Sequence, residues 1–403
     1  MKDLLERFFP TGFAPQVYII TALAAINLFG SSMVWLLMAA YLRGFGLSMS
    51  IIGAISMGSV LLSAAFSVVG GSLYDTFGMR KLILSAFLFG TIILTIMGIT
   101  TSVVLLIVLY SLEWITWGIC MPTFNAAIAD FTPEKRRIEG YGLLRIGMNI
   151  GCGLGVIAGG VLARISYRIL FLTDASTYFI CFFITLLFVP ESILKSRSRP
   201  SESPKGYATM IRDTPFLFYT LLYFLMYVVY SVASGAPFTI YSLEYVRINT
   251  VQLGLLWGIN TLMIVFIQAP LTKVLSKLKM SSTLIIGSLF YPISYLLVLG
   301  ATGYIWLFGF IIIFTIGELI CAPTLSAVVA NFAPIEKRGR YMGFFGLFGE
   351  GGRAVGPLVG GVIMDVYTTM LWYTVIVLGL LVSFGYLLLG KKIDVRRTNE
   401  KIV

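Results

Sequence analysis

The chain has 403 residues, of which 58% are hydrophobic and 12% are charged, whereas soluble domains are about 45–50% apolar. It holds four cysteines, no histidine and no CxxC pair, so the usual ligand sets of zinc sites, haem attachment and thiol redox centres are missing. The composition predicts an integral membrane protein with no metal site and no cofactor.

Twelve stretches are apolar enough, and long enough, to cross the hydrocarbon core of a bilayer, which takes about 20 residues of helix. They run over residues 17–42, 50–73, 82–99, 103–128, 141–164, 169–189, 216–243, 250–272, 282–301, 304–330, 341–365 and 369–390. We therefore expect an all-α membrane protein with twelve transmembrane helices.

One connection is much longer than the others, and it is polar, basic and rich in proline and serine. This composition is typical of a solvated linker. We expect a six-helix bundle over residues 1–190, a cytoplasmic linker over 191–213, and a second six-helix bundle over 214–403 that ends in a short cytoplasmic tail.

The basic residues are distributed unevenly between the two sides. Twenty-three Lys and Arg residues lie in the termini and in the connections after even-numbered helices, and four lie on the other side. Because basic loops stay in the cytoplasm, we expect both termini there, in a plasma or inner membrane. The net charge of +11 then reflects topology and contact with anionic lipid, and we expect no nucleic-acid partner. The first 16 residues show no signal-peptide pattern.

The two halves of the chain resemble each other. Residues 120–161 align with residues 321–362 without a gap, and 14 of the 42 positions are identical. Proline, arginine and glycine are among the matched residues, as in the pairs Pro122/Pro323, Arg137/Arg338 and Gly142/Gly343. Tandem repeats in membrane transporters place the working site at their interface near the middle of the bilayer.

The connection after the second expected helix carries the pattern GxLxDxxGxRK, which is formed by Gly71, Leu73, Asp75, Gly78, Arg80 and Lys81. It resembles the signature of the Major Facilitator Superfamily (MFS). The resemblance implies two pseudo-symmetric six-helix bundles, and a cytoplasmic gate in which Asp75 locks onto the start of helix eleven with Arg80 and Lys81 beside it. The alternative is a capped tight turn with basic topology markers, in which Gly78 adopts a positive φ.

Glycines recur at every fourth position of helices five and eleven, at Gly151, Gly155 and Gly159, and at Gly352, Gly356 and Gly360. Both runs resemble the GxxxGPxxGG motif of the antiporter branch, although Val156 replaces the proline of the first copy. Glycine carries no side chain, so we expect another helix to approach closely there. Drug/proton antiporters usually carry an arginine in helix four, which here is absent from the stretch before Gly118.

Two carboxylates lie deep inside expected helices, where ionisable groups are usually functional. Glu113 is about 11 residues into helix four, roughly 16 Å along its axis, and Glu318 has a similar depth in helix ten. A carboxylate there can take a proton from one side of the membrane and release it to the other. Glu113 is thus the first candidate for proton coupling or cation binding, and Glu318 the second. The structural alternative is pairing with a neighbouring arginine or amide.

Three further sets of charged residues lie on or near the expected helices. Glu350 and Arg353, spaced i, i+3, form either an internal ion pair or part of a coupling or substrate site. Arg145 either extends to the cytoplasmic surface, or anchors an anionic substrate, or pairs with Asp75. Three acids near the outer helix ends are expected to be solvated: Asp174, Glu244 and Asp365.

Aromatic and polar residues share helix faces at Asn27, Trp35, Trp117, Tyr223 and Tyr227. Helix seven, which carries the two tyrosines, is expected to break at Gly235–Pro237. Such faces suit a cavity that takes amphipathic molecules, and their rings attract cations. Ordinary packing is the alternative for each ring.

Together these patterns predict a monomeric secondary active transporter, with a small-molecule substrate and protons as coupling ion, that exports small amphipathic or cationic compounds. The alternative is a symporter or uniporter for a sugar, an organic acid or another polar solute. A non-transporting membrane sensor or scaffold is a third class. We do not expect an enzyme, because the sequence offers no nucleophile with a base beside it.

Overall fold

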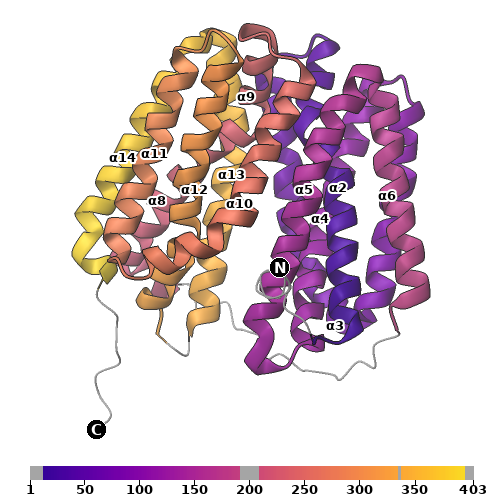
Figure 1. Cartoon of the computed structure of the whole chain (residues 1–403), viewed down its shortest axis with the longest axis horizontal. Helices are drawn as coiled ribbons and strands as arrows, with labels where there is room; N and C mark the ends of the chain where they lie inside the picture. The colour runs from indigo at the N-terminus through magenta and orange to yellow at the C-terminus, as the bar shows by residue number, and fades with distance from the viewer. Residues whose placement is uncertain (1–11, 191–207, 335–336, 395–403) are drawn as a thin grey trace. The chain divides into compact units, whose positions relative to one another are not determined.

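The computed structural model describes residues 12–190, 208–334 and 337–394, and this part of the chain is built of helices without a strand (Figure 1). The long helices are α2 (Pro15–Gly44), α3 (Met49–Ile99), α4 (Val103–Phe131), α5 (Arg137–Ile165), α6 (Tyr167–Phe188), α8 (Thr214–Ser234), α10 (Thr250–Leu275), α11 (Met280–Leu299), α12 (Tyr304–Phe332), α13 (Arg338–Val366) and α14 (Thr368–Asp394). Short helical segments are η1 (Glu134–Arg136), α7 (Ala208–Ile211), α9 (Ala236–Ile240) and η3 (Tyr241–Tyr245). The all-α fold is confirmed. Most of the expected linker, residues 191–207, lies outside the described residues, as does the tail from residue 395.

Within the described residues, ten helical segments are long and apolar enough to cross a membrane. One of them, α3, has 51 residues and contains two expected spans, because the backbone at Gly78 (φ 76°, ψ 165°) interrupts the helix. The expected positive φ of this glycine is therefore confirmed. One expected span is not among these ten segments. It corresponds to α13, which carries Glu350 and Arg353.

Residue contacts divide the chain into two units. In the described part, the first unit holds α2, α3 from Gly58 onward, α4, α5, α6 and the segment Asn249–Val265. The second holds the segment Gly46–Met57, α8, α10 from Phe266 onward, and α11 to α14. The first turns of α3 thus belong to the second unit and the rest of α3 to the first. For α10 the assignment is reversed, with its first turns in the first unit.

In the first unit, α5 packs along α2 through its run of glycines. A Cβ atom on Gly151 would overlap the carbonyl oxygen of Ala25, and a Cβ atom on Gly155 would overlap that of Phe29. One turn further, a Cβ atom on Gly159 would also be too close to the backbone of α2. Because the two backbones touch at these positions, any side chain there would push the helices apart.

In the second unit, α13 packs on α8 in the same way. A Cβ atom on Gly352 would overlap the carbonyl oxygen of Phe224, and a Cβ atom on Gly356 would overlap the hydroxyl of Ser231. Gly360 continues the run against Pro237. The repeated glycine pattern therefore produces the same helix contact in each unit.

The predicted break of helix seven is confirmed. Helix α8 ends at Ser234, Gly235 is extended (φ −114°, ψ −166°), and α9 begins at Ala236. Pro237 has no N–H to donate to a carbonyl in the preceding turn, so a continuous helix would lose a hydrogen bond here.

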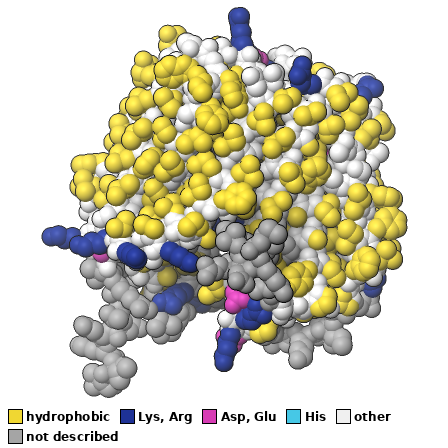
Figure 2. Space-filling view, in the orientation of Figure 1, with side chains coloured by type: hydrophobic (Ala, Val, Ile, Leu, Met, Phe, Trp, Pro, Cys, Tyr) yellow, Lys and Arg dark blue, Asp and Glu magenta, His cyan; other side chains and the backbone are white. Residues whose placement is uncertain are grey.

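Large apolar side chains are exposed along the helices. Hydrophobic residues cover most of the face drawn in Figure 2, and Lys and Arg side chains lie toward its upper and lower edges. Val68 and Val104 are each 73% exposed, and many other aliphatic and aromatic side chains exceed 40%. This surface suits contact with lipid acyl chains, since soluble proteins rarely expose large contiguous apolar patches.

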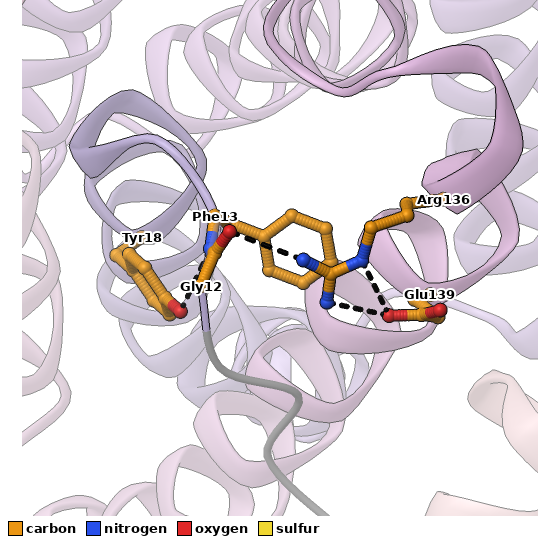
Figure 3. A network of polar contacts seen from close by, with 5 residues as sticks. All are labelled: Gly12, Phe13, Tyr18, Arg136 and Glu139. Carbon is orange, nitrogen blue, oxygen red and sulfur yellow. Dashed lines mark hydrogen bonds and ion pairs between the residues drawn. The ribbon is translucent and has the colours of Figure 1, made fainter.

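A polar network holds the chain just before α2 against the connection between α4 and α5 (Figure 3). The Arg136 guanidinium donates from Nη1 to the Gly12 carbonyl at 3.1 Å and from Nε to Glu139 Oε2 at 3.0 Å. It also lies 4.2 Å from the centre of the Phe13 ring, and the Phe13 N–H donates to the Tyr18 hydroxyl at 3.4 Å. One arginine thus links three segments of the first unit.

The start of α3 is capped by a residue from far along the chain. Asp365, near the end of α13, accepts the Met49 N–H at 2.9 Å and the Ser50 N–H at 2.8 Å, one on each carboxylate oxygen. A carboxylate at a helix N-terminus satisfies free N–H groups and favours the helix dipole. A Cβ atom on Gly361 would overlap the Met49 carbonyl, so the two backbones also touch. The expectation that Asp365 is merely solvated is therefore incomplete, because its side chain is exposed and holds α3 to α13.

The glycine contact predicts unequal effects of two alanine substitutions in α5. Gly151→Ala forces α5 away from Ala25 and is expected to lower stability by about 1–3 kcal/mol, the usual cost of overpacking. Gly142→Ala is the matched control, since nothing lies within 4 Å of its Cβ position, and alanine favours a helix by about 1 kcal/mol over glycine. Thermal unfolding of both purified variants at one heating rate tests this; equal midpoints would contradict the contact.

The cap on α3 predicts that Asp365→Ala lowers stability by about 0.5–2 kcal/mol, because two N–H groups lose their acceptor. Asp365→Asn is the control, since its amide oxygen still accepts one of the two N–H groups, and we expect a smaller loss. The measurement is the thermal unfolding midpoint in detergent. Wild-type midpoints for both variants would show that the cap contributes nothing to stability.

Candidate functional site

The first acidic cluster lies in the first unit and consists of Glu113, Thr116, Asp174, Thr177 and Tyr178. The Tyr178 hydroxyl donates to Glu113 Oε1 at 2.7 Å, and the Thr116 hydroxyl lies 3.4 Å from the same oxygen. The Thr116 and Tyr178 oxygens are 3.0 Å apart. Glu113 is 8% exposed, and no described Lys or Arg forms an ion pair with it. Its carboxyl group is therefore held by hydroxyls alone.

Local packing fixes the position of Tyr178. A Cβ atom on Gly90 of α3 would overlap the Tyr178 ring, so the ring occupies the space that a glycine leaves. The ring also meets Phe87 edge-on, with centroids 5.8 Å apart at 90°. Glu113 and Thr116 are one turn apart on α4, so both reach the same hydroxyl.

Asp174 is fully buried, so the expectation that it is solvated is wrong. Its Oδ1 accepts the Thr177 hydroxyl at 3.2 Å, and its Oδ2 has no hydrogen-bond partner. The eighth residue of α6 lies about 10 Å from the start of that helix, which is deep enough to leave water. Gly30 of α2 faces it, and a Cβ atom there would overlap Asp174 Oδ1.

The remaining predicted residues of the first unit lie on α2 and α4. Asn27 is 1% exposed, and its amide nitrogen has no hydrogen-bond partner. Trp35 is half-buried and meets Trp257 of α10 edge-on, with centroids 6.1 Å apart at 71°. Trp117 is half-buried, one turn after Glu113 on α4.

The second acidic cluster lies in the second unit and consists of Glu318, Tyr230, Tyr227, Glu350 and Arg353. Glu318 on α12 is half-buried, and its Oε1 accepts the Tyr230 hydroxyl at 3.3 Å. The Tyr230 ring stacks on Phe314, one turn before Glu318, with centroids 5.4 Å apart. A phenol therefore meets the carboxylate here too, but the group keeps partial exposure.

The two predicted tyrosines of α8 form a continuous row of rings with Tyr230. Tyr223 is buried and stacks on Phe345 of α13 at 3.7 Å between centroids. Tyr227 lies 4.6 Å from Tyr223 and 5.7 Å from Tyr230. The structure thus joins Tyr223 and Tyr227 to Glu318, and such a row can contact an apolar or cationic group.

Glu350 and Arg353 form the internal ion pair that was one of the two interpretations. The Arg353 guanidinium donates to Glu350 Oε2 from Nε at 3.0 Å and from Nη2 at 2.5 Å. Their side chains are 43% and 30% exposed. Tyr227 lies within electrostatic range of both, and of Glu318. The positive charge of Arg353 is therefore largely compensated on its own helix.

The predicted gate residues lie where α3 is interrupted. Asp75 and Lys81 are exposed, and no described residue hydrogen-bonds the Asp75 carboxylate. Arg80 donates to the Leu186 carbonyl at 2.8 Å, which ties α3 to the end of α6. Gly71 has no atom within 4 Å of its Cβ position. Arg145, in contrast, is exposed on α5.

Sequence reasoning missed four residues of these clusters, namely Thr116, Thr177, Tyr178 and Tyr230. One signal could have found two of them and Asp174: the acid, a threonine and a tyrosine stand at i, i+3 and i+4 in an otherwise apolar helix. Within the described residues, no group of three His, Cys, Asp or Glu side chains could hold a metal ion.

Comparison with known proteins agrees with this architecture. A family profile described as Major Facilitator Superfamily matches residues 20–357 and 281–401. YttB, an uncharacterized MFS-type transporter of Bacillus subtilis, is 27% identical over 377 residues, which cover 91% of this chain and 93% of the relative. The multidrug resistance protein MdtH of Escherichia coli is 23% identical over 372 residues, which cover 85% of each chain.

Two solved structures have the same fold. The nucleoside transporter NupG matches with a TM-score of 0.80 at 11% identity, covering 93% of this chain and 99% of that one. A bacterial homolog of the human lysosomal transporter Spinster, inward-facing and unoccupied, matches with a TM-score of 0.78 at 13% identity, covering 96% and 100%. At these identities the likeness concerns the fold alone.

The ion pair on α13 predicts that replacing one of its two residues lowers stability more than replacing both. Glu350→Gln leaves Arg353 without its carboxylate in a membrane helix, and we expect a loss of about 1–3 kcal/mol, since both groups are partly exposed. Adding Arg353→Met to Glu350→Gln removes the stranded charge and restores most of that loss. Thermal unfolding of both variants measures it; a double variant less stable than the single one would contradict simple pairing.

Proposed function

We propose that this chain, which belongs to the Major Facilitator Superfamily of membrane transporters, exports small amphipathic or cationic compounds in exchange for protons. It is an integral multi-pass membrane protein with a small-molecule substrate. The halves 1–190 and 214–403 alternate in exposing a binding site to either side of the membrane. The protein works as a monomer in a plasma or inner membrane, with both termini in the cytoplasm.

The observation that carries this proposal is the environment of Glu113. Glu113 is 8% exposed, and the hydrogen-bond partners of its carboxyl group are the hydroxyls of Tyr178 and Thr116. An ionised carboxylate in such a place costs several kcal/mol unless a cation accompanies it. Glu113 therefore holds a proton whenever water and cations are kept away, and releases it when the site opens. This is the property that a proton-coupling group needs.

The second acidic cluster supports a substrate that is apolar and positively charged. Glu318 keeps partial exposure, so its carboxylate can pair with a cation. The row of Tyr223, Tyr227 and Tyr230 leads to it, and phenol rings attract cations while burying apolar surface. The distant similarity to MdtH, a multidrug resistance protein, agrees with export.

The gate motif has a part in the same cycle. Asp75 is exposed beside the interruption of α3 at Gly78, and Arg80 ties this point to the end of α6. We assign Asp75, Arg80 and Lys81 to the cytoplasmic gate that the family resemblance implies. Gly71 and Gly78 shape the turn, and the glycine runs of α5 and α13 let packed helices move against α2 and α8 with little steric resistance.

The alternative, a symporter or uniporter for a polar solute, would use a free cation to hold an anionic group. Arg353 is compensated by Glu350, which leaves Arg145 for that role. The same experiment distinguishes the two functions.

The test uses purified protein in liposomes that contain a pH-sensitive dye, with an imposed proton gradient. Addition of a lipophilic cation is expected to drive proton movement in the wild type and to have no such effect in Glu113→Gln, which cannot ionise. Glu134→Gln is the control, since this glutamate is exposed on η1 outside the membrane helices.

If no cation moves protons in the wild type while a labelled sugar or organic acid equilibrates, the export proposal is wrong. Coupling that persists in Glu113→Gln would place the proton site elsewhere. The substitution of Glu318 by Gln separates the roles, because it should weaken the response to cations and leave proton binding at Glu113 intact.

A further inference from the structure

Asp174 is the one described acid that is fully buried and has an unpartnered oxygen. Oδ1 accepts the hydroxyl of Thr177, one turn along the same helix, while Oδ2 accepts nothing. Burying an ionised carboxylate with half of its acceptor capacity unused is more costly than burying a protonated one. A proton on Oδ2 would remove the charge.

Asp174 lies where α2 and α6 are in close contact. A Cβ atom on Gly30 would overlap both Asp174 Oδ1 and the Thr177 hydroxyl, so α2 approaches α6 closely enough to exclude water. Further along the same interface, the Cys181 thiol lies 3.7 Å from the Leu23 carbonyl. Helices α2 and α6 thus run antiparallel, and positions 23, 27 and 30 of α2 share the contacting face.

Asn27 is a second buried polar residue on this interface, on the other helix. It lies between the contacts made by Leu23 and Gly30, on the face of α2 that meets α6, and is 1% exposed. Its amide nitrogen has no hydrogen-bond partner. An unpaired donor and an unpaired acceptor therefore face the same α2–α6 interface.

In the described part of the chain, no Lys or Arg forms an ion pair with Asp174 or Glu113. Asp174 and Glu113 lie within electrostatic range of each other, and Tyr178, which donates to Glu113, stands one turn after Asp174 on α6. The titratable groups around the two acids are Tyr110 and Cys120 on α4, and Tyr178 and Cys181 on α6. Two buried carboxylates without a cation cannot both be ionised at ordinary pH.

We propose that Asp174 is a second proton-binding group, coupled by charge to Glu113, whose hydrogen-bond partner Tyr178 stands one turn after Asp174 on α6. This deepens the proposed function, since it takes the proton as coupling ion. Asp174 lies eight residues into α6 and Glu113 eleven residues into α4, and both helices begin on the same expected side. The pair thus places one proton site nearer the outer surface and one deeper. Loss of a proton from one acid makes the other hold its proton more firmly.

Infrared spectroscopy of the protein in lipid tests this without a transported substrate, because a protonated carboxyl group has its own C=O stretching band. A pH titration of the wild type is expected to show two such bands. Asp174→Asn removes one band and Glu113→Gln removes the other. Glu113→Gln also moves the titration midpoint of the Asp174 band by about one pH unit or more. Glu134→Gln, an exposed control, changes neither band.

Thr177→Val keeps the shape of the side chain and removes the hydroxyl that donates to Oδ1, so it keeps the test valid if Asp174→Asn does not fold. It should change the frequency of the Asp174 band and leave the Glu113 band in place. An unchanged carboxyl spectrum in Asp174→Asn or Thr177→Val would overturn the proposal. So would an Asp174 midpoint that is the same with and without Glu113.

The infrared spectra and the transport assay test the two proposals independently. If the wild type moves no protons in liposomes but both bands titrate as described, the export proposal fails and the paired site stands. If export depends on Glu113 but Asp174 shows no protonated band, the export proposal stands and the paired site is wrong.

Discussion

The cost of placing a charge among packed helices governs the chemistry of this protein. Two solutions occur in the two units. Glu350 is compensated by Arg353 on its own helix, whereas Glu113 and Asp174 have hydroxyl partners and, among the described residues, no paired cation. A compensated carboxylate can stay ionised, but an uncompensated one depends on a proton. The contrast is why we assign proton binding to the first unit. We assign cation recognition to Glu318 of the second unit, which keeps partial exposure.

The two halves of the internal repeat share their helix packing but differ in where their acidic residues lie. The glycine runs on α5 and α13 make the same close contacts with α2 and α8. At the offset that aligns these runs, Glu113 corresponds to Phe314, and Trp117 corresponds to Glu318. Each of the two helices therefore carries an acid and an aromatic residue four positions apart, in opposite order. A symmetric scaffold can in this way hold two acids in different surroundings.

The site was predictable in part. The depth of Glu113 and Glu318 followed from counting residues along an apolar helix, because the helical rise is constant. Their partners did not follow, since Tyr178 and Tyr230 reach them from other helices. Asp174 was placed in water by its distance from the helix end, and the structure buries it because Gly30 brings α2 against it. Burial depends on neighbours, which a single helix does not specify.

The sequence by itself determined the helical fold, the spans, the turn at Gly78, the break at Gly235 and the glycine seams. These features depend on local properties. In a bilayer, a single spanning segment can satisfy its backbone hydrogen bonds only by forming a helix, and glycine and proline change the backbone conformation at the positions where they occur. Tertiary structure alone decided that Asp365 caps α3, and that Asp174 and Glu113 lie within electrostatic range of each other. Polar pairing between helices depends on rotation and approach, which are set by many small packing contacts distributed along the whole chain.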